Sequence, residues 1–307
     1  MSTRLPWHLL ALIVVAIWGI TFVSTKTLIS AGLDPAEIFV VRFSLAYVGI
    51  WVLSLVQPGG KRLFCRSWQD ELLFAFLGVS GGSCYFLTEN TALAYTQASN
   101  VSFLVCSAPL WTILFSLIYR RLRRDRFADA MERVGSGWML ALGTLMALGG
   151  MALMLFDGQR VQVSLRGDLL ALGAALCWAF YSLFIGRMTD EYGALFATRK
   201  VFFYGILTIL PFLLGREFAP PALFREPAVW CNLLFLGLIA SLACFVAWNR
   251  VTARLGNISA VNYVYLNPIF TLISAMILLG ERLTPVSAGG SVLILLGVIL
   301  AGLQRRS

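Results

Sequence analysis

A long internal repeat constrains this chain more than any other feature of its sequence. Residues 76–116 align without a gap with residues 235–275 at a constant offset of 159. Upstream, Leu9–Leu12 and Trp18 correspond to Leu169–Leu172 and Trp178 at an offset of 160. The chain therefore contains two copies of one structural unit. The identical pairs in the long alignment are Phe76/Phe235, Leu77/Leu236, Gly78/Gly237, Phe86/Phe245, Asn90/Asn249, Ala94/Ala253, Val105/Val264, Pro109/Pro268 and Thr112/Thr271.

The composition is that of a membrane protein. Of the 307 residues, 59% are apolar and 13% are charged, with a mean hydropathy of +0.82. Soluble domains are about half apolar and one quarter charged, so too little polar surface remains here to solvate a globule. Ten runs approach the length that a membrane-spanning helix needs. They are 6–29, 36–56, 71–93, 98–119, 136–156, 167–187, 194–214, 228–249, 257–279 and 285–304.

The ten runs divide into two sets of five. We expect a first five-helix repeat over 1–156, a loop over 157–166 and a second repeat over 167–307. The first run has no clear small-residue cleavage site, so we interpret it as a span rather than a signal peptide. An odd number of spans in each copy inverts one copy relative to the other. That arrangement is typical of transporters whose site lies at the repeat interface.

The basic residues indicate the orientation in the membrane. With the N-terminus inside, 17 of the 24 Lys and Arg residues fall at cytoplasmic ends, which predicts both termini inside. The net charge of +9 might suggest a nucleic-acid partner. We exclude that partner because the charges lie in short gaps between apolar runs. The basic run 120–126 is interpreted as a topology anchor.

Several kinds of chemistry lack the residues they need. The chain has one histidine, His8, and six scattered cysteines without a CxxC pair, so no metal site or cofactor is expected. No G-x-x-x-x-G-K-[ST] motif for nucleotide phosphates is present. An enzyme would need clustered acid, base or metal groups. The sequence therefore does not predict an enzyme.

Glu89 is the carboxylate farthest from the predicted span ends, in the third run. It continues a helical stripe that contains Gly78, Gly82 and Tyr85, at steps of four, three and four residues. An ionisable group within a span usually faces a partner or a wet cavity. Two alternatives remain open. Glu89 is either a coupling residue, accepting a proton or facing a cationic substrate, or the partner of Arg42 in an internal salt bridge.

Other side chains are candidates for the wall of a polar cavity. The repeat mates Trp18 and Trp178 lie near the middle of their spans, each sharing a face with a hydroxyl side chain. A buried indole N–H needs a partner, although packing against lipid is the alternative. Pro109 and Pro268 are expected to kink their helices. The predicted cavity residues are Trp18, Thr21, Arg42, Tyr85, Glu89, Asn90, Trp178, Tyr181, Asn262 and Tyr265.

Three further predictions concern charges at span ends. Asp34 is expected to cap the second span, with Glu37 completing a box-like pattern. Lys26 and Arg42 have repeat equivalents near Arg187 and Lys200. Cations near both mouths of a cavity would attract an anionic substrate. Snorkelling to the interface is the alternative for Lys26, Arg187 and Arg199, whereas Arg42 lies deeper.

The sequence resembles the EamA-type branch of the drug/metabolite transporter superfamily. The segments that carry the resemblance are Ala92–Thr96, Ala98–Val101, Ala108–Leu110, Asn257–Ala260, Leu266–Phe270 and Leu279–Thr284, with Gly290 and Gly297 in the final span. One departure is Tyr119-Arg120-Arg121, where such proteins often carry a Gly-Glu turn.

The resemblance implies a carrier in the bacterial inner membrane that exports small metabolites, amino acids or related compounds by alternating access. A flippase for a lipid-linked substrate is the alternative. The expected partners are a small-molecule substrate and the lipid bilayer. A monomer already contains both copies, and the Gly78-x-x-x-Gly82 spacing also permits a helix dimer.

Overall fold

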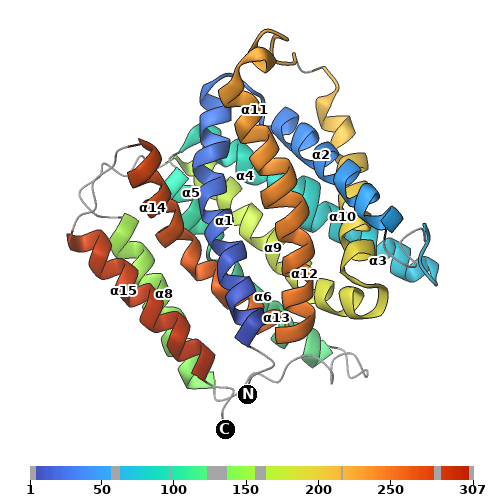
Figure 1. Ribbon diagram of the computed structural model, residues 1–307. Coiled ribbons are helices and arrows are strands. Elements are labelled where there is room, and N and C mark those ends of the chain that lie inside the picture. Colours follow the sequence, from blue (N-terminus) through green and yellow to red (C-terminus); the bar gives the residue numbers. More distant parts are fainter. Residues whose placement is uncertain are drawn as a thin grey trace.

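The computed structural model describes residues 5–56, 63–96, 98–122, 137–155, 164–215, 217–279 and 285–303. Over these residues the chain is helical and contains no strand (Figure 1). The basic run beyond residue 122, the Gly280-Glu281 turn and most of the predicted loop at 157–166 lie outside the described residues.

The helices follow the predicted runs closely. The first half contains α1 (Leu5–Ser30), α2 (Pro35–Val56), α3 (Trp68–Gly78), the π-helical η1 (Val79–Ser83), α4 (Cys84–Tyr95), α5 (Ala98–Val105), α6 (Ala108–Leu122) and α8 (Gly137–Leu155). The second half contains α9 (Leu165–Tyr192), α10 (Ala194–Ile209), η2 (Leu210–Leu213), η3 (Leu223–Arg225), α11 (Pro227–Leu234), the π-helical η4 (Phe235–Ala243), α12 (Cys244–Leu255), α13 (Asn257–Val261), η5 (Asn262–Leu266), α14 (Asn267–Leu279) and α15 (Pro285–Leu303).

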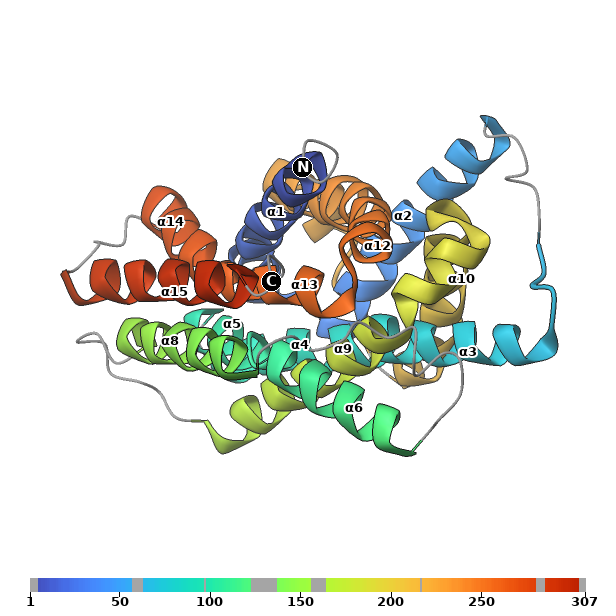
Figure 2. The same cartoon turned by 90° about the horizontal axis from the view of Figure 1, so that it is seen from below.

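The protein is an all-α membrane protein. Eight described helices are long and apolar enough to cross a bilayer, several of them assembled from consecutive segments such as α3, η1 and α4. The two remaining predicted runs correspond to α8 and α15. These two helices pack side by side at one edge of the molecule, as Figures 1 and 2 both show.

Close glycine contacts hold α8 and α15 together. Gly150 lies against the backbone of Gly290, and Gly297 lies against the backbone of Gly143. Each glycine lacks a side chain that would keep the backbones apart, and small residues are what close helix pairs in membranes use. Gly143 and Gly150 of the first copy correspond to Gly290 and Gly297 of the second copy at a constant offset of 147. Each of the two contacts is therefore the repeat equivalent of the other, and equivalent surfaces of the two copies meet here.

A second glycine pair relates the copies across the molecule. Gly78 packs against Val201 and Tyr204 of α10, whereas its repeat mate Gly237 packs against Arg42 and Leu45 of α2. Arg42 and Leu45 correspond to Val201 and Tyr204 at the same offset of 159 that relates Gly78 to Gly237. The packing therefore makes Val201, the residue next to Lys200, the counterpart of Arg42.

Both copies contain a π-helical segment that the sequence did not predict. The mate of η1 at offset 159 is 238–242, which lies within η4. A π segment widens the helix and releases part of the regular backbone hydrogen bonding, and it occurs often at functional sites. Here each segment lies directly before the helix that supplies cavity residues, α4 in one copy and α12 in the other.

The spans that contain Pro109 and Pro268 are interrupted. Helix α5 ends at Val105 and α6 begins at Ala108, immediately before the first proline. In the second copy, the 3₁₀-helical η5 separates α13 from α14, which begins at Asn267. Proline removes a backbone donor and clashes with the preceding turn, which accounts for both interruptions.

The start of α2 confirms the predicted cap and shows a further contact of Glu37. The Asp34 side chain accepts a hydrogen bond from the Ala36 N–H at 2.8 Å, as a helix cap does. The buried Glu37 carboxylate accepts a hydrogen bond from the Ala219 N–H at 3.2 Å. Glu37 therefore ties α2 to the segment before α11.

Candidate functional site

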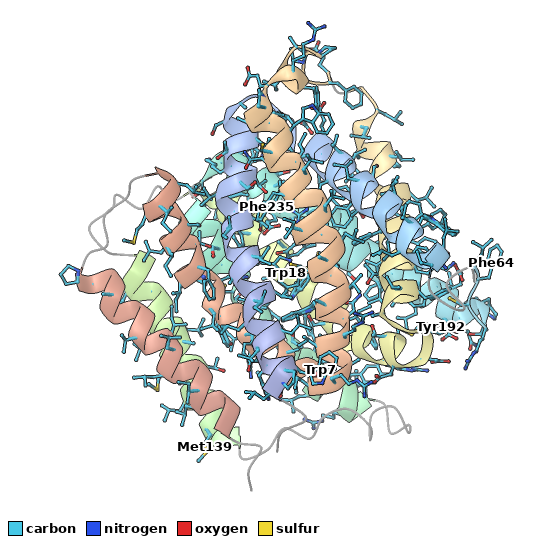
Figure 3. All side chains as sticks on the ribbon, viewed as in Figure 1. Trp7, Trp18, Phe64, Met139, Tyr192 and Phe235 are labelled. Atoms are coloured by element: carbon cyan, nitrogen blue, oxygen red, sulfur yellow. The ribbon has the colours of Figure 1, made fainter. Side chains whose placement is uncertain are left out.

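A cavity lies between helices from both copies of the repeat. It measures about 390 Å³, including the space that opens to solvent. Figure 3 places Trp18, one of its lining residues, near the middle of the molecule. Membrane carriers commonly bind their substrates at this depth, at the interface of their repeats. The lining residues are Trp18, Thr21, Phe22, Arg42, Tyr85, Phe86, Glu89, Val105, Trp178, Phe245, Val264 and Asn267.

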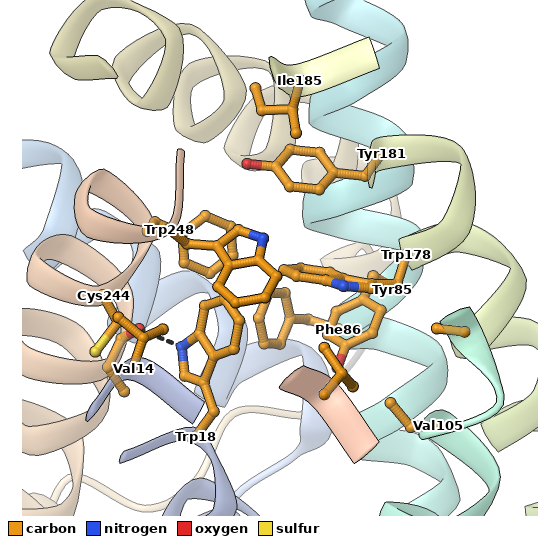
Figure 4. Packing of buried hydrophobic residues seen from close by; sticks show 14 of the residues in the cluster. Val14, Trp18, Tyr85, Phe86, Val105, Trp178, Tyr181, Ile185, Cys244 and Trp248 are labelled. Atoms are coloured by element: carbon orange, nitrogen blue, oxygen red, sulfur yellow. Dashed lines mark hydrogen bonds between the residues drawn. The ribbon is translucent and has the colours of Figure 1, made fainter. Parts of the chain in front are cut away.

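Aromatic rings form much of the cavity wall (Figure 4). Trp18 and Trp178 meet edge to face, with ring centroids 5.3 Å apart. Trp18 also contacts Trp248 at 5.0 Å, and Trp178 contacts Tyr85 at 5.1 Å. Such offset and edge-to-face arrangements are favourable for aromatic pairs. The rings come from α1, α4, α9 and α12, so neither copy alone builds this wall.

Glu89 supplies a carboxylate to the cavity. Its side chain is buried, with 6% of its surface exposed. The Tyr85 hydroxyl, one helical turn earlier on α4, donates a hydrogen bond to Glu89 Oε1 at 3.2 Å. The predicted stripe on α4 thus delivers both groups to one place, because residues four apart share a helix face.

Arg42 supplies a guanidinium from α2. It is 2% exposed, its Nε donates to Ser241 Oγ at 2.5 Å, and its Cζ lies 4.5 Å from the centre of the Phe86 ring. Within the described residues no ion pair joins Arg42 to Glu89, so the internal salt bridge is not formed in this structure. A buried charge is costly without a partner. Both charges line the same cavity and are available to a ligand.

Two buried polar groups in the wall also lack a partner. The Trp178 Nε1–H and the Asn267 Oδ1 make no hydrogen bond within the described structure. By contrast, the Trp18 Nε1–H donates to the Ala240 carbonyl at 3.0 Å. Each buried group left unpaired costs about 1–3 kcal/mol. Both residues line the cavity, and the two unpaired atoms are themselves buried.

Two other predicted residues hold helices together instead. The Asn90 side-chain amide donates to the Pro35 carbonyl at 3.0 Å and fixes α4 to the start of α2. The Tyr181 hydroxyl donates to Asn249 Oδ1 at 2.6 Å and fixes α9 to α12. Neither residue is among those that line the cavity. They act on the site through the helices that they position.

The remaining predicted residues also separate into two groups. Thr21 lines the cavity, and its hydroxyl donates to the Trp18 carbonyl at 2.6 Å. Asn262 and Tyr265 are buried in η5 but do not line the cavity, which receives Val264 from that segment instead. The prediction assumed a regular α-helix, whereas η5 is a 3₁₀ helix. The change in helical phase turns Asn262 and Tyr265 away from the positions that an α-helix would give them.

The cations predicted near the cavity mouths have structural partners. Lys26 Nζ donates to the Leu93 carbonyl at 2.5 Å and to the Thr96 carbonyl at 3.1 Å, at the end of α4. Cations are favourable at a helix C-terminus. Lys200 forms an ion pair with Glu71. In this structure, Lys26 and Lys200 stabilise helix packing, and Arg42 is the cation that lines the cavity.

Sequence reasoning missed half of the lining residues. Phe86 and Phe245 are repeat mates, so their recurrence could have marked them as part of the repeat interface. Asn267 lies directly before Pro268 at a helix break, and this position is a usable signal. Val105 and Val264 are likewise identical repeat mates, whereas Phe22 carries no distinguishing feature in the sequence, because apolar residues abound throughout the spans.

Comparison with known proteins agrees with this architecture. A solved crystal structure, described only as that of a protein, superimposes with a TM-score of 0.73 and 18% sequence identity, covering 99% of this chain and 100% of the other. This likeness shows the same fold.

Sequence relatives are named as transporters. An uncharacterized transporter of Archaeoglobus fulgidus is 27% identical, covering 95% of this chain and 96% of the relative. A probable terminal-alkyne amino-acid exporter of Streptantibioticus cattleyicolor is 25% identical, covering 93% and 92%. A probable amino-acid metabolite efflux pump of Salmonella typhimurium is 26% identical, covering 95% and 93%.

The family match covers most of the chain and occurs twice. The model of the EamA-like transporter family matches residues 5–124 and again residues 165–303. The two matched stretches correspond to the two copies of the repeat. The chain belongs to the EamA-like transporter family.

Proposed function

We propose that this membrane transporter is a secondary-active exporter of amino acids or closely related metabolites. One observation carries the proposal: Arg42 and Glu89 line a shared aromatic cavity without forming an ion pair with each other. An amino-acid zwitterion carries one negative and one positive group, and these complement the two charged side chains of the cavity. Its carboxylate pairs with Arg42, and its ammonium group pairs with Glu89. The tryptophan and phenylalanine rings receive its side chain.

The relatives support the substrate class. Two of them are named as a probable amino-acid exporter and a probable amino-acid metabolite efflux pump. An arginine holds a carboxylate through paired hydrogen bonds and a fixed plane, which favours this residue over lysine for such recognition.

Glu89 also gives the carrier a means of coupling. A carboxylate in a cavity binds either a proton or the ammonium group of a substrate. Because the two cannot bind at the same time, proton movement and substrate movement across the membrane become linked. The Tyr85 hydroxyl orients the carboxylate. Since no nucleotide-binding motif is present in the sequence, the driving force in this proposal is an ion or substrate gradient.

Alternating access is the transport mechanism that we infer. The interrupted spans α5–α6 and α13–η5–α14 border the cavity through Val105, Val264 and Asn267. Broken helices at a repeat interface are a recurrent feature of carriers that alternate in this way. In this proposal the two copies, divided at 157–166, are inverted five-helix repeats that rock against each other.

We place the protein in the bacterial inner membrane with both termini cytoplasmic. The start of α1 and the end of α15 lie at the same end of the molecule (Figure 1), as an even number of spans requires. The excess of Lys and Arg at that end of the spans favours the cytoplasm.

The proposal is tested by ligand binding followed by transport. Purified protein is screened by thermal shift against amino acids, organic acids, amines and aromatic metabolites, because a ligand of the folded state raises the melting temperature. A hit is then tested for exchange in proteoliposomes. We expect amino acids to bind and exchange, and binding in Arg42→Ala and Glu89→Gln to be much weaker than in the wild type. Binding that persists in both variants contradicts this location of the site.

A further inference from the structure

The two halves of the cavity differ at one pair of repeat mates. Trp18 and Trp178 occupy equivalent places, yet the Trp18 N–H is bonded to the Ala240 carbonyl of η4 and the Trp178 N–H has no partner in the described structure. The mate of Ala240 at offset 159 is Gly81 of η1. The bond that symmetry would place between Trp178 and Gly81 is therefore not made.

Tyr181 accounts for this asymmetry. Its ring lies directly against Gly81, at the position that a Cβ would occupy. Its mate in the first copy at offset 160 is the much smaller Thr21, which leaves room for Trp18 to reach the backbone of η4. The Tyr181 hydroxyl is anchored on Asn249. Tyr181 thus covers the π-helical backbone at Gly81, and its ring lies beside that of Trp178, with the centroids 5.1 Å apart.

An acceptor in the same wall complements this donor. Asn267 Oδ1 is also without a hydrogen-bond partner in the described structure, and Asn267 lines the same cavity from α14. Trp178 and Asn267 are each 4% exposed. Trp178 and Asn267 therefore bring one unsatisfied donor and one unsatisfied acceptor to the residues that line the cavity, separate from the charges of Arg42 and Glu89, and the two atoms themselves are buried.

We propose that Trp178 Nε1–H and Asn267 Oδ1 select substrates whose side chain carries a hydroxyl group. A hydroxyl accepts from the indole and donates to the amide oxygen, so one small group satisfies both. An apolar substrate of equal size leaves both buried groups unpaired. A site built in this way discriminates strongly against the analogue that lacks the polar group. This inference rests on the proposed function and narrows its substrate class.

The test uses pairs of probes that differ mainly in the hydroxyl. L-Threonine is compared with L-valine, and L-tyrosine with L-phenylalanine, as competitors and exchange substrates in proteoliposomes of the full chain. We expect the hydroxylated member of at least one pair to bind about tenfold more tightly, given the strength of two neutral hydrogen bonds.

Three variants separate the hydrogen bonds from general packing. Trp178→Phe keeps an aromatic ring and removes the N–H, so the preference for the hydroxylated probe should fall to about twofold or less. Asn267→Leu removes the acceptor for the substrate hydroxyl, so it should lower the preference for the hydroxylated probe to the same extent. Trp18→Phe is the matched control. Its N–H is already bonded to Ala240, so it changes the binding of both probes alike and keeps their ratio.

Each outcome decides a different point. Equal binding of both members of each pair in the wild type overturns this inference and leaves the proposed function intact. Loss of the preference in Trp18→Phe as well as in Trp178→Phe overturns it too. Failure of all four amino acids to bind overturns this inference, whereas the proposed function is decided by the wider ligand screen. If Trp178→Phe does not fold, the ratio in Asn267→Leu decides the result.

Discussion

The indole rings of Trp18 and Trp178 lie 160 positions apart in the sequence and meet edge to face at 5.3 Å, with their planes at 90°. Because the two residues are repeat mates, their contact lies where equivalent surfaces of the two copies come together. Any movement of one copy relative to the other must change this contact. In the proposed alternating-access mechanism, such a movement would therefore change the cavity wall at Trp18 and Trp178.

Glu89→Gln should remove the response of transport to a proton gradient. The amide keeps the shape of the side chain but does not take up a proton or hold a charge. Exchange in proteoliposomes, measured from acid to alkaline pH, should vary for the wild type and stay flat for the variant. Glu191→Gln is the matched control, because Glu191 is exposed at the end of α9. A normal pH profile in Glu89→Gln rules out the coupling role.

Arg42→Gln should weaken binding of a substrate carboxylate. Hydrogen bonds to charged groups are worth about 1.5–3 kcal/mol, which corresponds to a loss of about tenfold to a hundredfold. The affinity for the corresponding amino-acid amide should change much less. Arg166→Gln is the matched control, since Arg166 is an exposed arginine stacked on Tyr95 at 4.5 Å. Equal losses for acid and amide would show that Arg42 supports the fold instead.

Glu71→Gln should destabilise the contact between α3 and α10. Glu71 pairs with Lys200 and accepts a hydrogen bond from the Tyr204 hydroxyl at 2.5 Å. Because the Glu71 side chain is one quarter exposed, solvent screens the pair, and we expect a loss of about 1–2 kcal/mol. Thermal unfolding in detergent measures it.

A double-mutant cycle separates the ion pair from other effects of these substitutions. Glu71→Gln combined with Lys200→Gln should cost less than the two single changes added together. Strict additivity would mean that the two side chains stabilise the protein independently.

Gly150→Ala should disrupt the pairing of α8 with α15. A Cβ at this position would lie 2.8 Å from the backbone nitrogen of Ile294, and overpacking of this kind costs about 1–3 kcal/mol. The neighbouring Gly149 is the control, because its Cβ would meet Leu293 at an ordinary 3.7 Å. We therefore expect a lower melting temperature for Gly150→Ala than for Gly149→Ala. A reversed order contradicts the assigned interface.

The orientation can be measured with single cysteines. Leu63 and Phe218 are 53% and 61% exposed and lie on segments that we assign to opposite sides of the membrane. In intact cells a membrane-impermeant maleimide should label Phe218→Cys but not Leu63→Cys, in a Cys231→Ser background. Native Cys65 contributes little background, because burial and its contacts with Glu71 raise the pKa of its thiol to about 12. Labelling of Leu63→Cys alone would reverse the topology.

The periodic part of the structure could be predicted from the sequence. Apolar runs of about 20 residues must become helices in a bilayer, since lipid offers no other partner for the backbone. The step of four residues between Tyr85 and Glu89 placed them on one face of α4, where the structure shows their hydrogen bond. The constant offset of 159 identified the repeat mates, including Asn90 and Asn249.

The sequence by itself thus determined the membrane class, the repeat and the faces of regular helices, because these depend on local spacing and composition. Only the tertiary structure decided which groups are satisfied. Arg42 is bonded to Ser241 rather than paired with Glu89, and Trp18 is bonded where its mate Trp178 is not. These differences arise from contacts between distant helices and from the π and 3₁₀ turns that change their phase, and no local pattern records them.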